Sequence, residues 1–360
     1  MPRGLCDTRA MIPLLRKALS FGLLASALAL GPASSTAGAQ QGGGFYSYLQ
    51  YLSARARGEG VSERTIAAMT VGLTYNPRVI ELDRSQPGGN PAAVSTTYSD
   101  FEPYRRSHVD AARINGGRRQ YAALVGQRTA IERRFGVPLP ILVAIWGHET
   151  NYGSYTGDFD LARSLATLAY DGRRRQLFSD EFIALLKMAD RGVPRYRLKG
   201  SWAGAFGNPQ FLPSVYLRVA ADGDGDGFAD IWSSRADTVA SIGSYFRDAG
   251  WRPGEPWGIA VDVPANFNRA RLGTTLASPR CQAVFARHSG WKTMREWRAL
   301  GLVPRKGYWP GDNVFASLIE PDGPGRTAYL LTGNYRVILD YNCSNYYALS
   351  VGLLADAIAS

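Results

Sequence analysis

Apolar and polar residues follow the 3.6-residue period of amphipathic helices along much of the chain. The segments with this pattern cover residues 45–56, 64–74, 107–135, 164–170, 180–190 and 237–249. A last apolar stretch, residues 346–358, predicts a closing helix. Residues 82–98 contain Gln-Pro-Gly-Gly-Asn-Pro and predict a loop, because these residues favour turns over helices. The pattern therefore predicts a mainly helical protein.

One helix differs from the others because it is apolar on every side. Ile141-Leu142-Val143-Ala144-Ile145-Trp146 has no polar face, and Pro140 suits the first turn of a helix. Such a helix is buried all round. We therefore expect it at the centre of the fold.

The composition changes after Trp251, where Gly, Pro and Trp become frequent. Strand-like runs follow at residues 314–319, 328–332 and 335–339. We predict an α+β fold, mainly α, with a small antiparallel β insertion. The expected domains are a helical domain at 45–135, a core at 136–250, a β-containing domain at 251–340, and a segment at 341–360 that packs back on the core.

The first 39 residues are typical of a secretory signal. Four basic residues precede an apolar run at 18–30, and Ala37-Gly38-Ala39 suits cleavage after Ala39. A membrane anchor is the alternative, but the run is shorter than the roughly 20 residues that span a bilayer. No cysteine directly follows it, so no lipid-modified cysteine is expected. We predict a periplasmic or secreted protein with no membrane span in the mature chain and a flexible lead-in at 40–44.

Charge and cysteines add limited information. The net charge of +11 falls to +8 without the signal, and a basic exported protein is attracted to polyanions such as peptidoglycan, teichoic acid, anionic lipid or nucleic acid. Export and the lack of a nucleic-acid-binding motif argue against nucleic acid. Cys6 lies in the signal, so Cys281 and Cys343 are expected to form a disulfide in an oxidising compartment. Two separately buried thiols are the alternative.

Glu149 lies where the apolar helix meets the polar turn Thr150-Asn151-Tyr152-Gly153. A carboxyl group backed by Ile145 and Trp146 is partly desolvated, and desolvation raises a carboxyl pKa towards the range of a general acid. Protonation of a glycosidic oxygen needs such a group. Position by itself is weak evidence, because glutamates at helix ends commonly cap, pair with a base or face solvent.

Three ordered blocks strengthen the case. They are Ile-Trp-Gly-His-Glu-Thr-Asn-Tyr-Gly at 145–153, Leu-Ala-Thr-Leu-Ala-Tyr at 165–170, and Lys-Gly-Ser-Trp-Ala-Gly-Ala-Phe-Gly-Asn-Pro-Gln-Phe-Leu-Pro-Ser at 199–214. Together they resemble the membrane-bound lytic murein transglycosylase B family, here without a lipid-modified cysteine. The resemblance implies a lysozyme-like core with Glu149 as catalytic acid and base. It also implies glycan contacts from Arg173, Arg174, Ser201, Gln210, Tyr245, Tyr341, Asn342 and Tyr347.

The reaction implied by the resemblance needs no cofactor. Hydrolases usually use two carboxylates, whereas a lytic transglycosylase needs one, which protonates the leaving oxygen and then deprotonates the C6 hydroxyl that attacks C1. Asp158 and Asp160 lie close in sequence, and a role for either in the cleft would favour a lysozyme-type hydrolase. A non-catalytic peptidoglycan-binding protein is the other alternative. The expected partners are peptidoglycan glycan strands and cell-wall enzyme complexes.

The segment 222–232 has the aspartate spacing of an EF-hand loop. Asp222, Asp224 and Asp226 stand at positions 1, 3 and 5, and Phe228 offers a carbonyl at position 7. Position 12 is a serine, where glutamate is usual. The resembled family closes a longer loop with a later aspartate, which implies Asp237 here, in a calcium loop at 222–237. We favour a structural Ca²⁺; a solvated Asp/Gly turn is the alternative.

Overall fold

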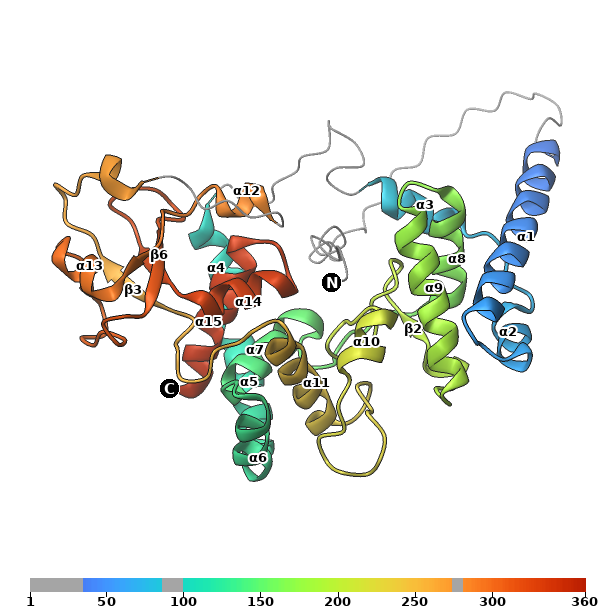
Figure 1. The fold of residues 1–360 in the computed structure, drawn as a ribbon, viewed down its shortest axis with the longest axis horizontal. Coiled ribbons are helices and arrows are strands. Elements are labelled where there is room, and N and C mark those ends of the chain that lie inside the picture. The colour runs from blue at the N-terminus through green and yellow to red at the C-terminus, as the bar shows by residue number, and fades with distance from the viewer. Residues whose placement is uncertain (1–34, 86–99, 274–280) are drawn as a thin grey trace, which may run out of the picture. The chain divides into compact units, whose positions relative to one another are not determined.

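The computed structural model describes residues 35–85, 100–273 and 281–360. These residues form two compact units, each built from segments that are distant in sequence (Figure 1). We call residues 35–85 and 156–218 the Arg173 unit. The remaining described residues, 100–155, 219–273 and 281–360, form the Glu149 unit. Both units are mostly helical, as predicted.

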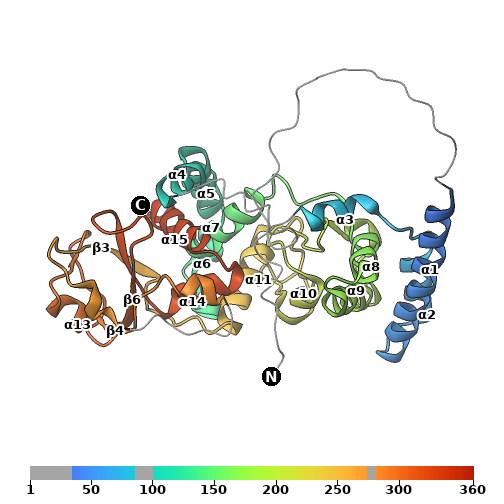
Figure 2. The same ribbon diagram turned by 90° about the horizontal axis from the view of Figure 1, so that it is seen from above.

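The Arg173 unit is built around two adjacent helices, α8 (Leu161–Asp171) and α9 (Arg175–Asp190), which lie side by side in Figures 1 and 2. Three more helices pack on this pair: α1 (Ser35–Gly58), α2 (Glu63–Thr70) and α3 (Pro77–Arg84). A 3-10 turn at Arg195–Arg197 leads to a two-stranded antiparallel ribbon, β1 (Phe159–Asp160) with β2 (Lys199–Gly200), and α10 (Pro213–Val219) follows.

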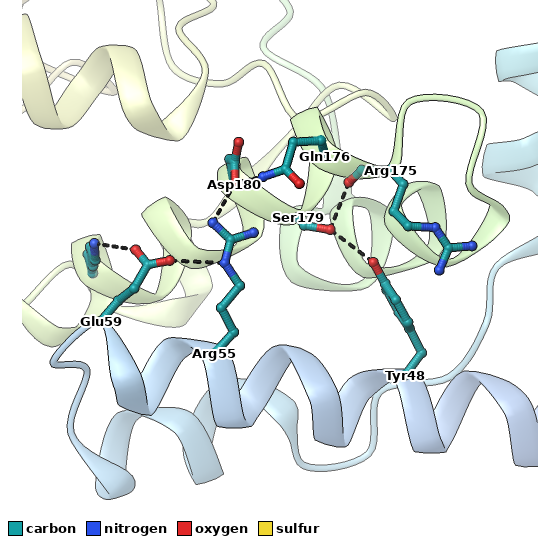
Figure 3. Close-up of polar contacts among 8 residues, drawn as sticks. Tyr48, Arg55, Glu59, Arg175, Gln176, Ser179 and Asp180 are labelled. Atoms are coloured by element: carbon teal, nitrogen blue, oxygen red, sulfur yellow. Dashed lines mark hydrogen bonds and ion pairs between the residues drawn. The ribbon is translucent and has the colours of Figure 1, made fainter. Parts of the chain in front are cut away.

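Helix α1 contacts α9 through both apolar and polar side chains. Leu52 of α1 is fully buried, and burying a leucine side chain contributes about 1.5–3 kcal/mol. Figure 3 shows the polar side, where Arg55 bonds Asp180 at 2.5 Å and also Glu59, and the Tyr48 and Ser179 hydroxyls lie 2.9 Å apart. Partly exposed ion pairs of this kind contribute about 0–1 kcal/mol each. Burial of Leu52 therefore contributes more to holding α1 in place than any one of these ion pairs.

The expected flexible lead-in at 40–44 is helical in the structure, because α1 begins at Ser35. The Phe45 ring at the end of this segment contacts the rings of Tyr170 and Tyr75, at centroid distances of 5.7 and 6.1 Å. Tertiary packing of this kind overrides the weak helix propensity of the preceding glycines. Residues 1–34, with most of the predicted signal, lie outside the described residues.

The Glu149 unit surrounds the apolar helix α7 (Leu139–Thr150), which is buried from Leu139 to Gly147. This helix packs against α5, α6, α11 and α15. The helices of this unit are α4 (Phe101–His108), α5 (Ala111–Ala123), α6 (Val125–Phe135), α11 (Arg235–Asp248), α12 (Gln282–Phe285), α13 (Met294–Ala299), α14 (Gly333–Tyr341) and α15 (Asn345–Ala359), with a 3-10 turn at Arg269–Leu272. The sequence pattern correctly predicted a central buried helix.

A five-stranded antiparallel sheet completes this unit. Its strands are β3 (Gly258–Asp262), β4 (Lys292–Thr293), β5 (Val303–Pro304), β6 (Phe315–Ile319) and β7 (Ala328–Leu331), in the order β4-β6-β7-β3-β5. Trp297 of α13 is fully buried against the sheet and donates its indole N–H to the Ala316 carbonyl at 3.0 Å. The small β region is therefore a folded sheet with its own apolar core.

The strand expected at 335–339 is wrong, because these residues lie in α14. Thr332 caps this helix by accepting a hydrogen bond from the Asn334 N–H. Tyr335, Ile338 and Leu339 are buried at i, i+3 and i+4, which is one face of a helix. A short apolar run does not by itself distinguish a buried strand from a helix.

The division into units also differs from the contiguous domains expected from the sequence. The expected domain at 45–135 is shared between the two units, and so is the expected core at 136–250. The reason is long-range pairing: α3 packs on α8, and α7 packs on α15. In the part of the chain that is described, no helix is both long and apolar enough to cross a bilayer.

Candidate active site

Glu149 lies in the last turn of α7, one residue before the helix ends at Thr150. The helix stops because Asn151, Tyr152 and Gly153 all have positive φ angles, of 48°, 60° and 84°. Non-glycine residues in this region are uncommon and are held there by their surroundings. The turn directs the chain away and leaves Glu149 half-buried at the end of a buried helix.

Tyr152 holds this turn against the helix. Its ring packs on Gly147, where a Cβ atom would lie 2.6 Å from the ring. Its hydroxyl donates to the Arg113 carbonyl at 2.7 Å. The glycine of the Trp-Gly-His-Glu sequence is therefore explained by the close approach of Tyr152, which fixes the last turn of α7 and with it Glu149.

Tyr347 of α15 donates its hydroxyl to Oε1 of Glu149 at 2.6 Å. Burial of the phenol, and after it the charge of Glu149, raises the pKa of Tyr347 well above its ordinary value. The phenol therefore stays protonated at neutral pH and acts as a hydrogen-bond donor. This contact brings together two predicted site residues that are far apart in sequence.

The start of α15 is anchored close to Tyr347. Cys281 and Cys343 form a disulfide with Cα atoms 5.6 Å apart, the pairing expected from the sequence. His288 lies 2.8 Å from Oδ1 of Asn345, the first residue of α15. Burial lowers the pKa of His288 to about 4, so the ring is neutral at neutral pH. These links fix the backbone that carries Tyr347.

Three other predicted glycan contacts lie in the same unit. The rings of Tyr245 and Tyr341 meet edge to face at 4.9 Å, and Tyr245 donates to the Asp340 carbonyl at 2.9 Å. Both tyrosines are buried. Asn342 directly follows α14, and its Oδ1 is a buried acceptor with no hydrogen-bond partner among the described residues. Asn342 can therefore accept a bond from a ligand.

Two histidines next to this site were missed by the sequence reasoning. The His148 ring lies 5.5 Å from the Tyr347 ring and 6.2 Å from the His108 ring, which stacks on Tyr104 at 3.8 Å. Burial, with a smaller effect from the charge of Arg113, lowers the pKa of His148 well below its ordinary value. A neutral imidazole therefore lies beside the phenol that binds Glu149. The position of His148 directly before Glu149 is the sequence feature that could have identified it.

In the Arg173 unit, Arg173 and Arg174 both bind Asp83, with N–O distances of 2.5 and 2.6 Å. Asp83 is buried. Burial raises its pKa, but the hydrogen bonds from the two arginines outweigh burial, so the pKa of Asp83 is lowered overall. Asp83 could not be identified from the sequence, because it lies about 90 residues before its partners. This pairing fixes the positions of both guanidinium groups.

Ser201 and Gln210 belong to one loop of the same unit. The Ser201 hydroxyl accepts a bond from the Ala205 N–H at 2.9 Å. Gln210 has a φ of 51°, and its Nε2 donates to the Thr156 and Gly207 carbonyls at 3.0 Å each. The loop therefore has a defined conformation that holds both predicted contacts.

The aspartate loop brings three carboxylates together. Oxygen atoms of Asp222, Asp224 and Asp237 lie within 4.8 Å of one another. Asp226, which was expected to join them, is outside this group and accepts a bond from the Phe228 N–H at 2.8 Å. The closing position at Asp237 therefore agrees with the geometry, whereas Asp226 does not belong to the carboxylate group.

Comparisons with known proteins identify relatives. Membrane-bound lytic murein transglycosylase B of Escherichia coli (strain K12) is 35% identical over 231 residues, which are 62% of this chain and 58% of the relative. The chain thus matches less than two thirds of that relative's length. SltB3 of Pseudomonas aeruginosa, solved in complex with NAG-NAM-pentapeptide, has a TM-score of 0.77 at 35% identity and covers 88% of this chain and 80% of its own.

A third relative is the E. coli lytic transglycosylase Slt35, solved in complex with calcium. Its TM-score is 0.68 at 25% identity, over 88% of this chain and 93% of its own. The model of the transglycosylase SLT domain family matches residues 44–356, which is most of the sequence. The chain therefore belongs to the transglycosylase SLT domain family.

Proposed function

We propose that this protein is a lytic transglycosylase that cleaves the β-1,4 bond between N-acetylmuramic acid and N-acetylglucosamine in peptidoglycan and forms 1,6-anhydro ends. The observation that carries the proposal is Glu149, a half-buried carboxylate at the end of a buried helix, bound by Tyr347 at 2.6 Å. Membership of the family and the NAG-NAM-pentapeptide bound to the similar SltB3 support it.

Glu149 acts first as acid and then as base. Its proton goes to the glycosidic oxygen as the bond from that oxygen to C1 of the muramic acid breaks. The positive charge that develops on the sugar is stabilised by its acetamido group or by nearby dipoles. The Glu149 carboxylate then accepts the proton of the C6 hydroxyl as O6 bonds C1. The glutamate returns to its starting state, and no water is consumed.

Tyr347 positions Glu149 for both steps. A phenol that stays protonated donates to the carboxylate and limits its rotation, so the carboxylate is held for proton transfer. Asn342 Oδ1, which lacks a partner among the described residues, accepts a bond from a sugar hydroxyl or acetamido N–H. Tyr245 and Tyr341 offer ring faces and edges, and Arg173, Arg174, Ser201 and Gln210 bind polar and carboxylate groups of the glycan.

A lysozyme-type hydrolase would need a second carboxylate. Asp160, one of the two aspartates that could have served, caps α8 by accepting the Arg163 N–H at 2.9 Å and pairs with Arg195 at 3.2 Å. These contacts support a structural role for Asp160.

Product analysis tests the proposal. Purified peptidoglycan is digested with the protein, and the muropeptides are identified by mass spectrometry. We expect 1,6-anhydromuramic acid ends, which are 18 Da lighter than reducing ends. Reducing ends would indicate hydrolysis and reject the transglycosylase. Binding without any released muropeptide would indicate a non-catalytic protein.

We also propose that the loop at 222–237 binds a structural Ca²⁺. Asp222, Asp224 and Asp237 provide the oxygen donors that calcium prefers, with the Phe228 carbonyl as a fourth. Asp237 is fully buried, and burial raises its pKa. A bound cation would compensate for burying this carboxylate close to two others. Calcium bound to the similar Slt35 supports the same conclusion.

Calorimetry tests the calcium site. Protein freed of metal with a chelator should bind Ca²⁺, and Ca²⁺ should raise its melting temperature. Asp237→Asn should lose both effects, whereas Asp226→Asn, outside the carboxylate group, should keep most of the shift. An equal response of both variants, or no shift for the unmodified protein, would contradict this site.

We propose that the protein is exported, with its signal cleaved near Ala39, and acts on the cell wall in the periplasm or outside the cell, alone or within cell-wall enzyme complexes. The basic segment followed by an apolar run at 18–30 supports this. N-terminal sequencing of the exported protein tests it. A mature chain that retains residues 1–39 would contradict it.

A further inference from the structure

The Glu149 unit contains a cavity of about 470 Å³ at the end of α7 that is opposite Glu149. Its walls come from Pro140 at the start of α7, the segment from Trp251 to Ala260, Pro304 of β5 and the last turns of α15. A helix rises about 1.5 Å per residue, so Pro140 and Glu149 are about 14 Å apart along α7. The cavity is therefore separate from the catalytic carboxylate.

Aromatic rings form much of the wall. Trp251 and Trp257 are buried, whereas Tyr308 is exposed at the edge of the cavity. Trp257 lies directly on the backbone of α15, where a Cβ atom at Gly352 would collide with its ring. Its indole N–H donates to Oδ1 of Asp356 at 3.3 Å. The volume falls within the roughly 300–1,000 Å³ of small-molecule sites, and such walls are typical of them.

Charged groups of both signs also line this cavity. Asp356 and Glu255 bring carboxylates, and Lys306 brings an exposed ammonium group. Burial raises the pKa of Asp356 despite the bond from Trp257 and the charge of Lys306, and a second cation would lower this pKa further. Glu255 pairs through Oε1 with Arg252 at 3.6 Å, but its Oε2 and Nε1 of Trp251 are buried without a hydrogen-bond partner among the described residues. Buried polar groups are normally paired, so a ligand with complementary groups would stabilise them.

We propose that this cavity is a non-catalytic binding site for a short zwitterionic peptide. The peptide's ammonium group pairs with Asp356 and Glu255, its carboxylate pairs with Lys306, and its side chains pack on Trp257 and Tyr308. A neutral sugar offers no ammonium group to Asp356 and no carboxylate to Lys306, and a polyanion would be repelled by the two carboxylates. Peptides attached to peptidoglycan carry amino and carboxyl groups, so this cavity could help to hold the substrate. That role rests on the proposed function, whereas the binding of a free peptide does not.

Nuclear magnetic resonance of the tryptophan indole N–H groups tests this site. The sample is ¹⁵N-labelled Glu149→Gln protein, and its cross-peaks are assigned with Trp251→Phe and Trp257→Phe. Four probes are titrated: Ala-Ala with free ends, N-acetyl-Ala-Ala, Ala-Ala amide, and N-acetylglucosamine. We expect free Ala-Ala to shift the Trp251 and Trp257 peaks, and each blocked peptide to bind about tenfold more weakly, because each lacks one charged hydrogen bond.

Charge variants assign the two ends of the peptide. Asp356→Asn should remove the preference for a free ammonium group, and Lys306→Ala should remove the preference for a free carboxylate. Lys292→Ala, outside the cavity lining, is the matched control and should change neither. Melting curves and turnover of peptidoglycan by the same variants, made with Glu149 intact, show whether they fold.

Three outcomes would overturn the proposal: no shift at Trp251 and Trp257 with free Ala-Ala, equal binding of the free and blocked peptides, or binding of N-acetylglucosamine in their place. Each of these outcomes can be told apart from failure of the proposed transglycosylase activity. That activity is measured by the release of anhydro products, whereas peptide binding is measured by shifts of the indole peaks. Selective binding of Ala-Ala by a protein that releases no anhydro products would support this site and reject only the transglycosylase.

Discussion

Asp83 and Glu149 are both acidic residues withdrawn from solvent, but their partners differ in charge. Asp83 is bound by two guanidinium groups, and its pKa is lowered. Glu149 accepts a hydrogen bond from a neutral phenol, Tyr347. A carboxylate fixed between two cations stays ionised and serves the fold, whereas the hydrogen bond from Tyr347 to Glu149 brings no charge. Burial by itself therefore does not identify a catalytic acid.

Glu149→Gln is expected to have the largest effect on activity. The amide keeps the shape and can still accept from Tyr347, but it cannot transfer a proton. Release of anhydromuropeptides should fall by about 10²–10⁴-fold, the usual contribution of a general acid or base. The melting temperature should change little, and this separates lost chemistry from lost folding. Near-normal turnover would exclude Glu149 from the reaction.

Asp83→Asn is expected to reduce stability strongly. The change removes the charge that receives the two charge-assisted hydrogen bonds and should cost about 1.5–3 kcal/mol, measured as the free energy of unfolding in urea. Glu81→Gln on the same helix is the control: Glu81 pairs with Arg78 on the surface, and this change should leave the unfolding free energy nearly unchanged. Equal effects of the two changes would contradict the structural role of Asp83.

The same pair has a pH signature. The pKa of Asp83 is lower in the folded than in the unfolded chain, so its stabilising contribution is fully present above the unfolded value of about 4 and is lost as the pH falls through the folded value. The unmodified protein should therefore lose stability below about pH 4 more steeply than Asp83→Asn. Parallel stability curves for the two proteins would show that Asp83 is not the group responsible.

The sequence predicted those features that depend on neighbours along the chain. Residues 141–146 are apolar on every side and require a buried helix, and most other helices follow from local periodicity. Glu149 was found because its block is local. The sheet region was also predicted, apart from residues 335–339, where an apolar run fits both a strand and a buried helix.

Features that depend on contacts between distant segments were not predicted. Asp83 lies in the segment 82–98, which was expected to be a loop. No residue close to it in sequence indicates that it binds Arg173 and Arg174. The division into two units was missed for the same reason, because it results from pairs such as α7 with α15. Tyr347 was expected among the glycan contacts, but its bond to Glu149 required the folded chain.

Tyr347→Phe tests the neutral hydrogen-bond donor of Glu149 and is expected to have a smaller effect on turnover than Glu149→Gln. The ring stays and fills the same buried space, so only the hydroxyl and its 2.6 Å bond to Glu149 are lost. A hydrogen bond to a charged group contributes about 1.5–3 kcal/mol, so turnover should fall by about 10–100-fold, less than for Glu149→Gln. A positioning role predicts that kcat falls while KM for glycan fragments changes little, and that the pH profile of kcat shifts, because the phenol no longer stabilises the ionised carboxylate. An unchanged kcat with an unchanged pH profile would mean that Tyr347 serves only to pack α15 beside α7, and that the contrast between Asp83 and Glu149 does not depend on this phenol.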